Sequence, residues 1–132
     1  MSTINQVYPL VAGYSTDSFV PDTTLLGGEY ESATFPLPSN TLFTQYEVAL
    51  IDTTGTLKKW AAPAAGERVV VVCATADNLT ATAAANRTAA VMCWYEGRFN
   101  ELNLVYTGGA TANTVRGPAL PGIALEKPMT RN

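Results

Sequence analysis

The sequence has no histidine and few charged residues. Asp, Glu, Lys and Arg make up 14% of its 132 residues, whereas about a quarter is usual in soluble proteins. Without histidine the commonest general base is missing, and neither a Ser-His nor a Cys-His catalytic pair can form. The carboxylates are few, and the one close pair, Glu29 and Glu31, suits a solvated strand edge. We therefore expect no enzyme, no catalytic site and no cofactor.

Cysteine is nearly absent as well. Cys73 and Cys93 both lie in apolar segments, and neither has an adjacent basic residue that would lower its pKa. They are expected to be buried free thiols that pack as small apolar side chains. A disulfide stays open if their strands are neighbours, although a reducing compartment disfavours it. Their spacing is not that of a zinc site, so we expect no metal.

Long apolar runs and basic clusters are missing too. The longest apolar stretch, residues 69–74, is far shorter than the roughly 20 residues of a membrane helix. The net charge is −3, which argues against binding to phosphate backbones. The N-terminus lacks the basic start and apolar core of a signal peptide. The sequence therefore predicts no membrane or nucleic-acid partner, and folding in the cytosol of the cell that makes the protein.

Residues 46–60 have the pattern of a β-hairpin. Tyr46, Val48 and Leu50 alternate with Glu47, Ala49 and Ile51, which places the two sets on opposite faces of a strand. Residues 52–55, Asp-Thr-Thr-Gly, suit a type I turn with a bulge, since Asp accepts bonds from the turn backbone and Gly tolerates positive φ. A second strand then returns to Trp60.

The remaining pattern predicts a mainly β protein with short strands and little helix. Residues 69–74 carry β-branched side chains on both faces, which indicates a central strand covered on both sides. Residues 30–37 alternate loosely and end in the proline-rich run 36–40, which suits a turn or a sheet edge. Residues 77–87 suit a long exposed connection with a short helical turn. We expect a strand over 89–95, a tight turn at 96–98 and a further segment from Phe99 to Tyr106.

The first 24 residues differ from the rest and predict an extended N-terminal arm before a single β-rich domain, residues 25–132. Pro9, Gly13 and Pro21 interrupt them, and their apolar residues keep no regular period. A flexible terminus is common, but a purely flexible tail is usually poorer in aromatic and aliphatic residues. We therefore expect an arm that becomes ordered on a partner through Ile4, Val7, Tyr8, Leu10, Val11, Tyr14 and Phe19.

The order of segments is more specific than any one of them. It runs from Leu25-Leu26-Gly27-Gly28-Glu29-Tyr30 through the hairpin to the valine strand ending at Ala76-Asp77, then to residues 90–101, Ala-Val-Met-Cys-Trp-Tyr-Glu-Gly-Arg-Phe-Asn-Glu, and to Gly122-Ile123-Ala124-Leu125. This succession resembles the head-decoration proteins of lambda-like tailed bacteriophages over residues 25–125. The aromatic-x-Gly-x-Phe motif after the valine strand is its most telling piece.

The resemblance implies a β-clip or β-tulip decoration-protein fold that forms a homotrimer. Such cement proteins bind the major capsid protein on the outside of the expanded head, at three-fold and quasi-three-fold sites, and hold it against the pressure of packaged DNA. In the lambda type the arm adds a strand to capsid elements. The resemblance therefore implies a virion protein on the capsid surface, made in the bacterial cytoplasm. The trimer interface is not implied for particular residues.

A different viral β module is the alternative. A tail or receptor-binding domain would share the low charge, the short strands and the absence of catalytic residues. The position of the protein on the particle separates the two functions.

Overall fold

The protein is mainly β, as the sequence predicts, with 39% strand and 13% helix. The computed structural model describes residues 24–26, 29–119 and 122–127. In chain order the elements are β1 (Glu31–Pro36), β2 (Leu42–Phe43), β3 (Val48–Ile51), β4 (Leu57–Lys58), β5 (Arg68–Val72), β6 (Ala76–Asp77), the 3₁₀ turn η1 (Ala84–Asn86), β7 (Ala90–Asn100), the 3₁₀ turn η2 (Glu101–Asn103), α1 (Ala112–Ala119) and β8 (Ile123–Glu126).

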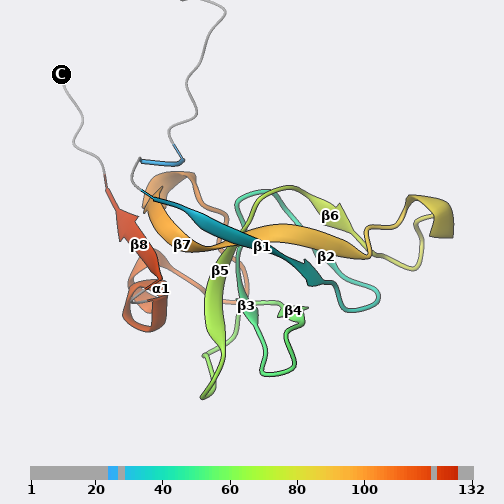
Figure 1. Cartoon of the computed structure of the whole chain (residues 1–132), viewed down its shortest axis with the longest axis horizontal. Coiled ribbons are helices and arrows are strands. Elements are labelled where there is room, and N and C mark those ends of the chain that lie inside the picture. The colour runs from blue at the N-terminus through green and yellow to red at the C-terminus, as the bar shows by residue number, and fades with distance from the viewer. Residues whose placement is uncertain (1–23, 27–28, 120–121, 128–132) are drawn as a thin grey trace, which may run out of the picture.

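The long strand β7 is the spine of the main sheet (Figure 1). The strand order is β1-β7-β5-β3-β4, and β8 pairs with β7 off this path. β1 runs antiparallel along the first part of β7, while β8 runs parallel to residues 97–100. The short strands β2 and β6 form a separate two-stranded sheet. β1 is thus an edge strand of the main sheet, and a turn follows it at residues 39–40; the sequence predicted a turn or an edge for residues 36–40.

Strands β3 and β5 are buried on both faces, which confirms the prediction of a covered central strand. Val69 and Val71 pack in a cluster with α1 and β8, the helix-side cluster, whereas Val70 and Val72 pack in a second one, the β2-side cluster. The alternation of strand side chains sends neighbouring residues to opposite clusters. The helix-side cluster contains Val48, Leu50, Trp60, Val69, Val71, Phe99, Leu104, Ala110, Val115, Ile123 and Leu125, and the β2-side cluster contains Leu37, Phe43, Ala49, Ile51, Leu57, Val70, Val72, Ala76, Val91 and Cys93.

The predicted hairpin is present as β3, a tight turn and β4. Asp52 accepts hydrogen bonds from the N–H groups of Thr54 at 2.9 Å and Thr56 at 3.0 Å, and Gly55 has φ = 88°. These contacts are the ones expected of Asp and Gly in such a turn. The strand begins at Val48 and not at Tyr46, because Tyr46 has φ = 67° and leaves the extended conformation.

The expected turn at residues 96–98 is wrong, because β7 continues through it as far as Asn100. Gly97 stays in the strand with φ = 152°, and its N–H donates to Gly122 O at 3.0 Å. The register between β1 and β7 shifts at Glu31/Ser32, so the strand is irregular here without reversing. Gly97 leaves room for neighbouring segments to approach β7 closely, and the chain does not reverse there.

Helix α1 is an element that the apolar pattern does not reveal. Thr111 caps it: its hydroxyl accepts from the Thr114 N–H at 3.2 Å, while the Thr111 N–H donates to the Thr114 hydroxyl at 2.8 Å. This reciprocal arrangement satisfies donors that the first turn leaves open. Val115 is fully buried on the helix-side cluster, and Arg116 forms an ion pair with Glu101. The helix thereby covers the sheet beside β8 (Figure 1).

The connection over residues 77–87 is a long exposed segment with one 3₁₀ turn, as predicted. Asp77 organises its start, since its carboxylate accepts from the Leu79 N–H at 2.9 Å and from the Thr82 hydroxyl at 2.7 Å. These hydrogen bonds, the Leu79 one first, hold the pKa of Asp77 below its usual value of 3.8.

Asp77→Asn is therefore expected to lower the midpoint of thermal unfolding at pH 7, with a smaller effect in acid. A carboxyl whose folded-state pKa is depressed stabilises the protein above its unfolded pKa of about 4. That contribution is lost as the pH falls through the lower, folded-state pKa. Melting curves of both proteins between pH 7 and pH 2.5 measure the difference. A gap between them that stays constant over this range would contradict the prediction.

Candidate functional site

The residues predicted to contact a capsid cannot be located in this structure. Ile4, Val7, Tyr8, Leu10, Val11, Tyr14 and Phe19 lie outside the described residues. The structure does describe the place where the predicted arm joins the body, because Thr24, the last residue of that arm, and the two after it are placed. The candidate site is therefore built from this junction, the arm root, which comprises residues 24–26 with their contacts on β7.

The backbone of the arm root pairs with β7 through one isolated bridge. The Asn100 N–H donates to Thr24 O at 2.8 Å, the Leu26 N–H donates to Arg98 O at 3.1 Å, and Leu25 pairs antiparallel with Phe99. β8 occupies the other edge of the same part of β7, where Gly97 makes its bond to Gly122. The arm root therefore contacts the C-terminal end of β7, at residues 98–100.

Tyr30 fixes the segment that follows the arm root. Its hydroxyl donates to Arg98 O at 2.7 Å, so that carbonyl accepts from both Leu26 and Tyr30. Its ring meets Phe99 edge-on, with centroids 5.5 Å apart and planes at 77°. A Cβ on Gly97 would lie 2.3 Å from the Tyr30 ring, so only glycine leaves room for this contact. Gly97 is thus the residue that leaves room for the Tyr30 ring against β7.

An open groove with mixed charge lies beside the arm root. Arg98 donates to both carboxylate oxygens of Glu126, at 2.7 and 2.9 Å, on the exposed surface. This hydrogen bond lowers the pKa of Glu126. Glu29 and Glu96 add two more carboxylates, so the groove carries an excess of negative charge. Such a groove suits polar contact with another protein surface. The groove is lined by Glu29, Glu96, Gly97, Arg98, Gly122 and Ala124.

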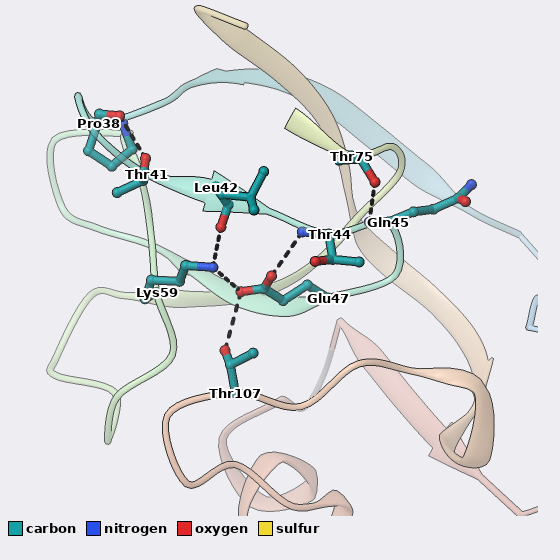
Figure 2. A network of polar contacts seen from close by, with 9 residues as sticks. All are labelled: Pro38, Thr41, Leu42, Thr44, Gln45, Glu47, Lys59, Thr75 and Thr107. Carbon is teal, nitrogen blue, oxygen red and sulfur yellow. Dashed lines mark hydrogen bonds and ion pairs between the residues drawn. The ribbon is translucent and has the colours of Figure 1, made fainter. Parts of the chain in front are cut away.

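A buried carboxylate forms the most connected polar network that Figure 2 shows. Glu47 is 1% exposed, and its Oε1 accepts from the Thr44 N–H at 2.9 Å. Its Oε2 accepts from Lys59 Nζ at 2.8 Å and from the Thr107 hydroxyl at 3.2 Å. Lys59 Nζ also donates to Leu42 O and lies 4.3 Å from the centroid of the Phe43 ring.

This network ties together three segments that are distant in sequence: the turn before β3, the residue after β4 and the loop before α1. A buried charge is tolerated when it is paired and its remaining lone pairs accept hydrogen bonds, and both conditions hold here. The sequence reading missed Glu47 as an important residue. Its signal was a single charge in an otherwise apolar strand pattern; no signal marked Thr107.

The two cysteines are free thiols, and the register explains why they do not pair. β5 and β7 are neighbours, but Val72 is the residue opposite Cys93, while the Cys73 N–H bonds to Met92 O. Burial raises the pKa of Cys73 to about 11 and that of Cys93 to about 12. Both thiols therefore stay protonated at neutral pH. Cys93 is buried, as predicted, whereas Cys73 is only partly buried.

The described residues form neither a metal-binding cluster nor a membrane-spanning helix. Within residues 24–26, 29–119 and 122–127, no three His, Cys, Asp or Glu side chains are grouped so that they could hold a metal ion. Among these same residues, no helix is long and apolar enough to cross a membrane.

Comparison with known proteins places the chain in no family. The sequence matches no family model, and the curated proteins searched contain no match to it.

Proposed function

We propose that this chain is a phage head-decoration protein. It binds the major capsid protein on the outer surface of the expanded head, at three-fold and quasi-three-fold sites, and stabilises the shell against packaged DNA. It acts as a homotrimer on the virion, with the β-rich domain as the rigid body and residues 1–24 as the attachment arm. The body belongs, on this proposal, to the β-clip or β-tulip type.

The observation that carries the proposal is the ordered set of motifs, whose members are neighbours in the fold. The hairpin strand β3 lies beside the valine strand β5, and β5 lies beside β7 with its aromatic-x-Gly-x-Phe motif. Segments that resemble one family in sequence order and also build one sheet support a shared architecture better than scattered matches do.

The arm root gives the proposal a mechanism of attachment. Residues 24–26 pair with β7 through two backbone hydrogen bonds and one antiparallel bridge at Leu25. An arm that continues from such backbone pairing is suited to add a strand to a sheet edge of a partner, where backbone bonds give affinity and side chains fill pockets. Three such arms in a trimer would attach strongly even if each is weak, since the later arms bind at high effective concentration.

Deletion of residues 1–20 tests the proposal. We expect the truncated protein to keep its melting midpoint, since the arm root and the core remain, and to lose at least tenfold in affinity for expanded capsids. The measurement is co-sedimentation with expanded, undecorated heads of the phage that encodes the chain. Unchanged saturation of the heads by a folded truncated protein would refute the role of the arm.

Removal of residues 128–132 is the matched control, because it also shortens the chain at one end but leaves the arm intact. The shortened protein should bind as the full chain does.

Electron microscopy of particles carrying the labelled protein tests the alternative function. Label on the tail and not on the shell would identify a tail or adhesion module. Sedimentation at micromolar concentration measures the trimer, and a monomer there would exclude a preformed trimer only.

A further inference from the structure

Tyr46 has an unusual backbone conformation for its size. Its φ is 67°, in the left-handed region that bulky side chains rarely adopt. The residue is nevertheless held on both sides: its N–H donates to Val72 O at 2.8 Å, and its carbonyl accepts from the Val105 N–H at 2.9 Å. Such a conformation persists only where the surroundings determine it strongly.

Glu47, whose carboxylate is buried, follows Tyr46 in the chain and closes the turn that contains Tyr46. Its own N–H donates to Thr44 O at 3.0 Å, while its Oε1 accepts from the Thr44 N–H at 2.9 Å. The carboxylate cannot rotate away, because Lys59 and Thr107 hold its other oxygen (Figure 2). The turn from Thr44 to Glu47 is therefore closed at both ends around Tyr46.

The conformation of Tyr46 places its ring on a neighbouring aromatic side chain. The Tyr46 and Trp94 rings stack, with centroids 6.1 Å apart and planes at 17°, and Trp94 contacts Phe99 at 5.6 Å. Phe99 in turn contacts the ring of Tyr30, which follows the arm root in the chain. A row of aromatic rings therefore runs from the strained turn to the place where the predicted arm joins the body.

We propose that Glu47, with Lys59 and Thr107, is a positioning latch that keeps Tyr46 in the left-handed conformation and so sets the aromatic row. The latch and the strain at Tyr46 are then energetically coupled. Loss of the Glu47 charge lets Tyr46 leave its conformation and disrupts its two backbone bonds. A glycine at position 46 has no such strain and keeps the turn without the latch. This inference does not depend on the proposed function.

A double-mutant cycle tests the coupling. Glu47→Gln is made in the native chain, with Tyr46→Ala and with Tyr46→Gly. Both changes at position 46 remove the ring, but only glycine removes the backbone strain. We expect Glu47→Gln to lower Tm by about 10 °C in the native chain and with Tyr46→Ala, and by less than half of that with Tyr46→Gly. Equal losses in all three would overturn the proposal, since they describe an ordinary buried ion pair.

Amide hydrogen exchange gives a local readout that a general loss of stability does not reproduce. Glu47→Gln is expected to speed exchange of the Val105 amide, which bonds to Tyr46 O, at least tenfold more than that of the Val70 amide in β5. Equal acceleration at both would overturn the proposal. If Glu47→Gln does not fold, Thr107→Val removes one bond of the latch and should give the same pattern more weakly; an equal effect on both amides in that variant would also overturn it.

Discussion

Gly97→Ala is expected to destabilise the folded protein by about 3 kcal/mol, from overpacking and backbone strain together. The new Cβ would lie 2.3 and 2.6 Å from two atoms of the Tyr30 ring, and φ = 152° is unfavourable for any residue with a side chain. The ring cannot move away without losing the hydrogen bond of its hydroxyl to Arg98 O and its contact with Phe99. Urea unfolding followed by circular dichroism measures the loss.

Two further variants separate the clash from the backbone strain. A Cβ at Gly109 would meet no atom within 4 Å, but the residue has φ = 82°. Gly109→Ala should therefore lower the free energy of unfolding by only about 1–2 kcal/mol. With Tyr30→Ala already present, Gly97→Ala should lose only about 1–2 kcal/mol, because the strained backbone and a milder contact with Phe99 Cε2 at 3.1 Å are all that remain. A loss from Gly97→Ala that is the same with and without Tyr30 would show that the close approach does not matter.

Phe99→Ala is expected to cost about 4 kcal/mol and to be the most damaging truncation in β7. The side chain is fully buried in the helix-side cluster and touches the rings of Trp94 and Tyr30. Its removal leaves a cavity between β7, β8 and α1 that the rigid strands cannot fill by small shifts. The same urea experiment measures the loss, and near-ultraviolet circular dichroism follows the aromatic row.

Met92→Ala is the control on the same strand. Met92 is 50% exposed, so its truncation should change stability by less than about 1 kcal/mol. A loss for Phe99→Ala no larger than that for Met92→Ala would contradict the burial assigned to Phe99.

The positions of Gly97 and Phe99 also bear on the capsid-binding experiment. Both residues contact the segment that leads out of the arm root, through Tyr30 and Leu25. A variant that loosens this segment can weaken binding through the body and not through the arm. Binding losses are therefore to be attributed to the arm only for variants that keep the native melting midpoint, as the deletion of residues 1–20 is expected to do.

Local patterns were enough to predict the hairpin and the covered central strand. In β3 and β5 the side chains alternate between two clusters, and the alternation is visible in the sequence because both faces need apolar residues. The turn of the hairpin was equally visible, since Asp52 and Gly55 are the residues that this turn requires. Both features depend on neighbours in the chain.

The errors concern residues whose role is set by distant neighbours. Glu96-Gly97-Arg98 has the composition of a tight turn, yet it lies inside β7, because Tyr30 and β8 approach that glycine from other parts of the chain. Helix α1 is short, and its cap is formed by two threonines in a region rich in threonine. Glu47 was predicted only as one of the alternating residues of a strand, because its partners Lys59 and Thr107 lie 12 and 60 positions away.

The sequence by itself determined the mainly β class and the order of the motifs, since these depend on residue types and short-range periodicity. Only the tertiary structure decided that the glycine in the aromatic-x-Gly-x-Phe motif makes room for the Tyr30 ring, that the backbone around Leu25 pairs with β7, and that a buried carboxylate closes the turn at Tyr46. Each of these depends on contacts between segments that are distant in sequence, and a local pattern carries no information on which segment will approach it.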